Sequence, residues 1–148
     1  MKEILSLMKL AFIGLLLVSM SGCFQYPEGP FFTMQTRDER LSGNWAIDQV
    51  LNRDGEDITS EFADLTLFAL MGKEDQNSIS LFKSSILDSF GTYSFADHSD
   101  YLIIIYTTYN GVDVSSEVVQ KFLEVRRLTD KWLYYIDDEG FEWHWEKY

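Results

Sequence analysis

The feature that most constrains the fold is a series of short apolar segments, separated by turn sequences, that runs from residue 41 to the end of the chain. β-Branched and aromatic residues dominate these segments, which is typical of strands. No long helical pattern lies between them. We therefore expect eight strands, over residues 45–51, 64–70, 78–83, 91–96, 101–109, 118–127, 131–136 and 141–146.

The sequences between the segments contain residues that reverse a chain easily. Asn110-Gly111 is a tight-turn dipeptide. Residues 52–55 and 137–140 are rich in Asp and Gly, which favour turns for backbone reasons. Residues 58–62 fit one helical turn, with Thr59 or Ser60 as its cap.

Two of the segments allow a more detailed prediction. In the first, alternation places Trp45, Ile47, Gln49 and Leu51 on one side of the strand. The pattern of residues 118–127 is also compatible with a helix.

Eight strands in series predict an all-β protein. The fold class that we expect is an eight-stranded antiparallel meander closed as a barrel, with a β-sandwich as the alternative. The last strand alternates aromatic with charged or polar residues, so one face is expected to be dry and the other wet. The bulk of Trp143 and Trp145 on the dry face suits a barrel interior.

The N-terminus has the layout of a secretory signal peptide. Lys2 and Lys9 give it a basic start, residues 10–18 are uniformly apolar, and small residues lead into Cys23, the only cysteine. The apolar run is too short to span a bilayer, which takes about 20 residues. An uncleaved anchor helix over residues 4–20 is the alternative.

The end of this segment resembles the lipobox of bacterial lipoproteins, in which the cysteine becomes the lipidated first residue. The resemblance implies that Cys23 is the lipid attachment site, so that acyl chains such as palmitate bind the protein to a membrane. In Gram-negative lipoproteins an Asp after the cysteine favours retention at the inner membrane. Phe24 stands there instead, which by resemblance favours the outer membrane of the cell envelope.

Residues 41–148 resemble small bacterial lipocalin-like lipoproteins. Gly43-Asn44-Trp45 matches the G-x-W signature that opens a lipocalin barrel, and Gly91-Thr92-Tyr93 matches a mid-chain strand. Gly55 with residues 57–59 loosely matches a segment after the first hairpin, and residues 128–133 with 143–145 match the closing strands. The resemblance implies a lipocalin-like β-barrel domain over 41–148, preceded by a signal peptide over 1–22 and a lipidated tether over 23–40.

The charge of the chain limits the kinds of partner that it is expected to bind. The formal net charge is −12, and removal of a signal with Lys2, Glu3 and Lys9 would leave 23 acidic and 10 basic residues. Such a balance disfavours nucleic acid and anionic membrane surfaces as direct partners. We therefore expect membrane attachment through the lipid on Cys23.

The polar residues of the chain do not form a recognisable catalytic or metal motif. His98 and His144 are the only histidines and have no zinc spacing. The acidic loops at 54–57 and 137–139 lack the ligand spacing of an EF-hand. A paired-carboxylate hydrolase is formally possible, but no pair stands out. We expect no metal, no cofactor and no catalysis.

Aromatic residues supply the candidate ligand-binding set. Ligand pockets are mostly apolar with few polar contacts, so a hollow barrel would hold a small apolar ligand. If the same rings fill the barrel, the protein is an interaction module for an envelope protein or a glycan. The candidate set is Trp45, Tyr93, Trp132, Tyr134, Trp143 and Trp145.

Overall fold

The computed structural model describes residues 35–72, 77–96 and 100–148. The predicted signal peptide, Cys23, most of the tether and His98 lie outside these residues. Within them, no helix has the length and hydropathy needed to cross a bilayer. The elements are α2 (Arg37–Leu41), β1 (Gly43–Leu51), η1 (Thr59–Glu61), β2 (Leu65–Leu70), β3 (Ser78–Lys83), β4 (Ile86–Phe95), β5 (Tyr101–Tyr109), β6 (Val112–Asp113), β7 (Val119–Leu128), β8 (Trp132–Ile136) and β9 (Glu142–Lys147).

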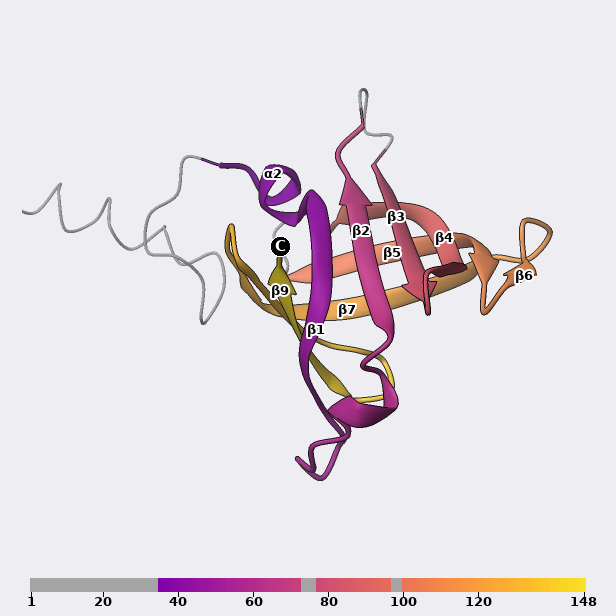
Figure 1. Cartoon of the computed structure of the whole chain (residues 1–148). Coiled ribbons are helices and arrows are strands. Elements are labelled where there is room, and N and C mark those ends of the chain that lie inside the picture. The colour runs from indigo at the N-terminus through magenta and orange to yellow at the C-terminus, as the bar shows by residue number, and fades with distance from the viewer. Residues whose placement is uncertain (1–34, 73–76, 97–99) are drawn as a thin grey trace, which may run out of the picture.

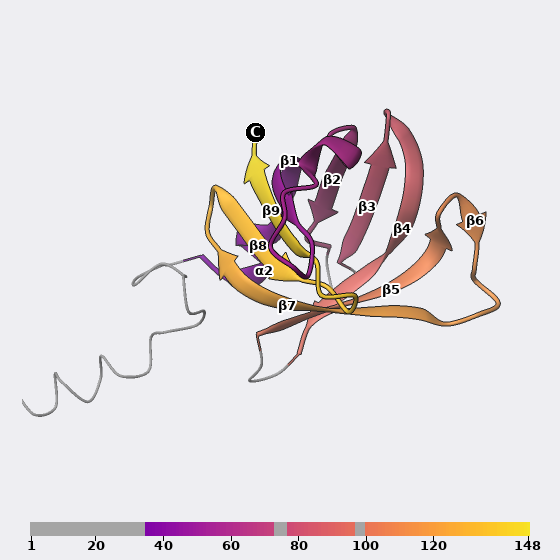
Figure 2. The ribbon, with the colours of Figure 1, turned by 90° about the horizontal axis from the view of Figure 1, so that it is seen from below.

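The strands form a closed antiparallel barrel. The sheet order is β4-β3-β2-β1-β9-β8-β7-β5-β6, and a further pairing of β4 with β5 closes the ring. Eight strands make up the ring, while the two-residue β6 pairs only with β5 and projects beside it (Figures 1 and 2). The predicted fold class is confirmed. The alternative of a helix over 118–127 was wrong, because β7 pairs along its length with β5 and β8.

The hairpin between β3 and β4 begins earlier than we predicted. β4 starts at Ile86 rather than Gly91, and Ser84 and Ser85 turn the chain with φ of 49° and 65°. Two consecutive positive φ angles are typical of the two-residue turns that join antiparallel strands. Asn and Gly usually occupy such positions, so the Ser-Ser pair gave no turn signal.

A β-bulge in β1 changes which side chains face inward. The register of β1 against β9 shifts between Ile47 and Gln49. Val50, rather than Gln49 or Leu51, is therefore paired with Trp143 and fully buried. The prediction that Gln49 and Leu51 share a face with Trp45 was wrong, because a bulge shifts the alternation by one residue.

The predicted helical turn is present as η1, but its cap differs from the prediction. Ile58 occupies the cap position and makes no capping hydrogen bond through its side chain. The Thr59 hydroxyl accepts a hydrogen bond from the backbone N–H of Val50 (2.9 Å) instead. Thr59 therefore ties η1 to β1 rather than capping the turn.

Helix α2 closes one end of the barrel. A capping box of Thr36 and Glu39 begins it, and its residues Arg40 and Leu41 are buried. Arg40 donates to the carbonyl of Leu128 (3.0 Å), and Trp45 Nε1 donates to that of Leu41 (2.8 Å). The predicted boundary between tether and domain at residue 41 therefore falls at the end of a helix that belongs to the barrel.

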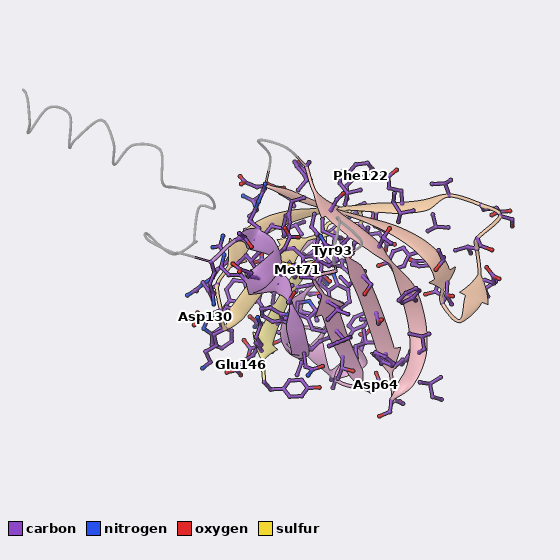
Figure 3. All side chains as sticks on the ribbon, turned by 90° about the horizontal axis from the view of Figure 1, so that it is seen from above. Asp64, Met71, Tyr93, Phe122, Asp130 and Glu146 are labelled. Atoms are coloured by element: carbon purple, nitrogen blue, oxygen red, sulfur yellow. The ribbon has the colours of Figure 1, made fainter. Side chains whose placement is uncertain are left out.

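The core fills the interior next to α2. Figure 3, which views this end, shows Tyr93 inside the ring of strands and Phe122 outside it. The buried cluster includes Trp45, Ala69, Leu102, Leu128, Leu133 and Trp145. Burial of each leucine side chain in this cluster stabilises the fold by about 1.5–3 kcal/mol.

Candidate ligand cavity

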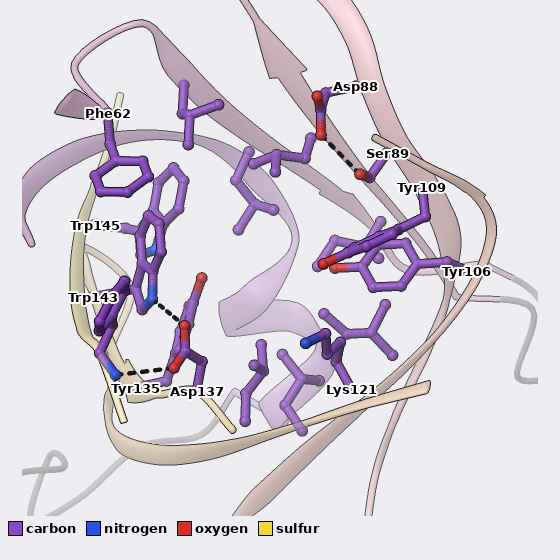
Figure 4. A pocket seen from close by; sticks show the side chains of 18 of the residues that line it. Phe62, Asp88, Ser89, Tyr106, Tyr109, Lys121, Tyr135, Asp137, Trp143 and Trp145 are labelled. Carbon is purple, nitrogen blue, oxygen red and sulfur yellow. Dashed lines mark hydrogen bonds between the residues drawn. The ribbon is translucent and has the colours of Figure 1, made fainter. Parts of the chain in front are cut away.

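The half of the barrel remote from α2 encloses a cavity of about 340 Å³ (Figure 4). Its outer rim lies at η1 and at the turns after β3, β5 and β8, all at the end of the barrel opposite α2. Apolar side chains from β2, β3, β5, β7 and β8 form its walls. These are Leu65, Leu67, Ile79, Leu81, Leu102, Ile104, Leu123 and Leu133.

Aromatic rings form one side of the cavity. Trp143 lies between Phe62 and Trp145, with ring centroids 5.0 Å and 6.1 Å away. Tyr135 stacks at 6.3 Å from Trp143. β8 and β9 place these rings together because Tyr135 is paired directly with Trp143, and paired residues of antiparallel strands share a face.

An acidic side chain holds this aromatic wall in place. Asp137 Oδ2 accepts a hydrogen bond from Trp143 Nε1 (2.8 Å), and its Oδ1 accepts from the backbone N–H groups of Glu139 and Phe141 (2.9 Å each). The carboxylate thus organises the β8–β9 turn and fixes the Trp143 ring.

The opposite side of the cavity is more polar. Tyr106 and Tyr109 of β5 lie with ring centroids 5.0 Å apart, and Lys121 of β7 lies beside them (Figure 4). Lys121 Nζ donates to both oxygens of Asp138, at 2.8 and 2.9 Å. These bonds raise the pKa of Lys121, so the ammonium keeps its charge over the ordinary pH range.

Burial keeps the tyrosines of the cavity neutral. Desolvation raises the pKa of Tyr106 and of Tyr135 well above the ordinary phenol value of 10. The indole of Trp145 partly offsets this effect at Tyr135. Both side chains therefore present protonated hydroxyl groups.

The structure divides the six predicted ligand-binding residues into three pairs. Trp143 and Trp145 line the cavity. Trp45 and Tyr93 are buried, with 0% and 3% exposure, but do not line it. Trp132 and Tyr134 are paired with Glu146 and His144 across β8 and β9 and lie on the outer face, away from the cavity.

Most of the polar lining was not predicted from the sequence. In β8 the buried positions are Leu133 and Tyr135, so strict alternation with Leu133 would have selected Tyr135 instead of Trp132 and Tyr134. The same alternation with Leu102 and Ile104 selects Tyr106. No local signal identifies Tyr109, Lys121 or Asp137, because β5, β7 and the β8–β9 turn meet only in the closed barrel.

Of the other polar candidates, the acidic loop 137–139 lines the cavity, whereas His144 and Asp57 lie outside it. His144 Nε2 lies 2.7 Å from Glu142 Oε1. The imidazole ring of His144 stacks on the ring of Tyr134, with ring centroids 4.0 Å apart. Asp57 bonds to Thr59 and Gln49. In the described part of the chain, no three acidic, histidine or cysteine side chains come together in a way that could hold a metal ion.

A closed eight-stranded antiparallel barrel with one plugged end and an apolar cavity toward the other is the architecture of a lipocalin-like barrel. A solved structure supports this class. The chain is similar to a lipocalin-like protein from Bacteroides uniformis, with a TM-score of 0.50 and 19% identity over 74% of this chain and 99% of that one. At this identity the similarity establishes the fold alone. No family model and no curated protein matches the sequence.

Proposed function

We propose that this protein is a non-catalytic binding protein of the bacterial cell envelope that holds a small apolar ligand in its barrel. The cavity carries the proposal. Its volume of about 340 Å³ lies at the lower end of the range for small-molecule sites, and its walls are mainly aliphatic and aromatic. The cavity also favours this function over a filled-barrel module that would bind an envelope protein or glycan through its outer surface.

The non-catalytic part of the proposal rests on how the acidic groups around the cavity are used. Asp137 accepts three hydrogen bonds, Asp138 is paired with Lys121, and Asp88 accepts from Ser89 (2.8 Å). Carboxylates engaged in this way position the cavity wall. Asp137 and Asp138 therefore do not stand free as general bases beside a nucleophile, and Ser89, which donates to Asp88, is only 1% exposed.

A binding experiment tests the ligand function. Every helix and strand of the described structure follows Thr36, so the experiment uses residues 24–148. Near-UV circular dichroism and cooperative thermal unfolding first show that this fragment folds. We expect the neutral dye N-phenyl-1-naphthylamine to bind with increased fluorescence and to be displaced by small apolar compounds. If neither the dye nor any compound of a broad panel bound, the proposed ligand function would be contradicted.

Two neighbouring residues of β7 provide a matched pair of variants. Leu123 lines the cavity, whereas Phe122 lies outside with 48% exposure. Leu123→Trp should fill the cavity and reduce dye binding by about tenfold or more, since overpacking leaves no room for the ligand. Phe122→Trp should bind dye as the unaltered protein does.

The envelope location rests on the N-terminal sequence. We propose that a signal peptide over residues 1–22 directs export and that acyl chains on Cys23 anchor the protein, in the outer membrane where the bacterium has one. Metabolic labelling with a palmitate analogue should tag the native chain and not a Cys23→Ala variant. Equal labelling of both, or of neither, would argue against the anchor.

A further inference from the structure

The polar centre of the cavity consists of hydroxyl groups. Tyr106, Tyr109 and Tyr135 direct their phenol oxygens toward the middle of the cavity from opposite walls (Figure 4). No hydrogen bond joins the hydroxyl of Tyr106 or Tyr109 to another described residue, and both residues are partly buried in the cavity wall. A phenol hydroxyl can both donate and accept a hydrogen bond. A bound oxygen atom would satisfy these groups.

Another unsatisfied donor lies in the opposite, aromatic wall. Trp145 is 1% exposed and lines the cavity, and its Nε1 makes no hydrogen bond to the described residues. The Trp145 indole lies close enough to Tyr135 to affect its pKa. A small shift of the Tyr135 ring would let its oxygen accept from Trp145 while its proton is donated into the cavity.

The charges around the cavity disfavour an anionic ligand. Four carboxylates (Asp88, Asp137, Asp138 and Glu139) and two ammonium groups (Lys83 and Lys121) line it, which leaves a net charge of −2. Lys121, the cation beside the hydroxyls, is already neutralised by Asp138. Lys83, the other cation of the lining, stands at the end of β3. A carboxylate ligand whose head group reached the hydroxyls would therefore meet net repulsion from the four carboxylates.

The same contacts disfavour a cationic ligand. An ammonium group that leaves water must find acceptors for three donors. The oxygens of Asp137 and Asp138 are already engaged, Asp88 accepts from Ser89, and Glu139 Oε1 lies 3.9 Å from the Lys121 ammonium. The phenols remain, and they suit a neutral polar group better than a full charge.

The volume limits the size of the ligand. Small-molecule sites usually measure about 300–1,000 Å³. A cavity of about 340 Å³ lies near the lower end of that range and therefore suits a small ligand.

We infer that the cavity selects a small uncharged ligand with one oxygen function, a ketone or an alcohol, on an apolar body. The oxygen would bond with the hydroxyls of Tyr106, Tyr109 and Tyr135, and the apolar body would occupy the aliphatic and aromatic walls. This inference rests on the proposed ligand-binding function and specifies its chemical class.

A series of eight-carbon compounds tests the inference by displacement of N-phenyl-1-naphthylamine at pH 7. The series is 2-octanone, 1-octanol, octane, octanoate and octylamine. We expect 2-octanone and 1-octanol to bind about tenfold more tightly than the other three, a difference of about 1.4 kcal/mol. Octanoate should gain affinity as salt is added, because salt screens the acidic rim.

Conservative variants assign the preference to individual groups. Tyr106→Phe should weaken 2-octanone binding about fivefold and leave octane binding unchanged, because only the hydroxyl is lost. Tyr134→Phe, on the outer face, is the matched control. Asp138→Asn should free Lys121 and strengthen octanoate binding several-fold, with little effect on 2-octanone.

The outcomes separate this inference from the proposed function. If no compound displaces the dye, or the dye does not bind, the ligand function itself fails. If octane and 2-octanone bind equally, or if octanoate or octylamine binds most tightly, the cavity still binds ligands but the assigned class is wrong. Unchanged 2-octanone affinity in Tyr106→Phe and in a Tyr106→Phe/Tyr109→Phe double variant would also overturn it.

Discussion

At Gly91 the strands β4 and β5 approach so closely that no side chain fits between them. A Cβ atom at this position would overlap the carbonyl oxygen of Ile105 and lie 2.9 Å from Tyr106 Cα. The register of β4 against β5 shifts at the same point, between Phe90 and Gly91. Glycine is therefore needed where these two strands close the barrel, and its neighbour Tyr106 faces the cavity.

Replacement of Gly91 should consequently be costly. We expect Gly91→Ala to lower the free energy of unfolding by about 2–3 kcal/mol, because the new methyl group must push two backbones apart. Urea unfolding followed by tryptophan fluorescence measures this. Ser94→Ala, at an exposed position of the same strand, is the control and should change stability by about 0.5 kcal/mol or less. A Gly91→Ala protein as stable as this control would contradict the argument.

Among the elements, α2 contributes far more to the closure of the barrel than its length of five residues suggests. Besides the bonds from Arg40 and to Leu41, the ammonium of Lys147 donates to the carbonyls of Arg40 (2.5 Å) and Ser42 (2.8 Å). The same ammonium lies 4.6 Å from the centre of the Trp45 ring. α2 thereby joins the first and last strands of the barrel, and its position sets the floor beneath the cavity.

The stability of this end should depend on Arg40. Arg40→Ala removes a buried, charge-assisted hydrogen bond to Leu128, and we expect it to cost about 2–3 kcal/mol in chemical unfolding. Lys131→Ala removes an exposed cation paired with Glu146 (3.0 Å) and should cost no more than about 1 kcal/mol. Hydrogen exchange should show faster exchange at the α2 end in Arg40→Ala only. Equal losses in the two variants would mean that α2 does not hold the barrel closed.

At the scale of the whole molecule, the buried tyrosines make stability sensitive to alkaline pH. Burial raises the pKa of Tyr93 to about 12, and it also raises those of Tyr106 and Tyr135. In the unfolded chain a tyrosine titrates near 10. Between these values the unfolded chain has released protons that the folded chain retains, so stability falls as the pH rises.

We therefore expect the free energy of unfolding to be constant near neutrality and to fall from about pH 10 to about pH 12, with each buried phenol contributing up to about 1.4 kcal/mol per pH unit. Tyr93→Phe should make this fall less steep. At pH 7 the variant should differ by less than about 1 kcal/mol, since the Tyr93 hydroxyl has no hydrogen-bond partner in the described structure. An unchanged slope above pH 10 would refute the linkage.

The local pattern of residues was enough to predict most of the barrel. Alternation and turn residues gave seven strands within about two residues of their ends, and only β4 was placed five residues late. The errors have two causes. The Ser84-Ser85 turn is local, but it uses residues that rarely occupy such positions. The bulge in β1 and the docking of α2 depend on β9 and β7, which are distant from them in the sequence.

What the sequence determined by itself is therefore the strand series, the turn positions and the excess of negative charge, because each depends on residues close together in the chain. Only the tertiary structure decided that the barrel is hollow and which rings face the hollow. Tyr106, Lys121 and Tyr135 come from three different strands, and closure of the sheet brings them to one cavity. A cavity is the space left over when all the strands are in place, so no single segment of sequence encodes it.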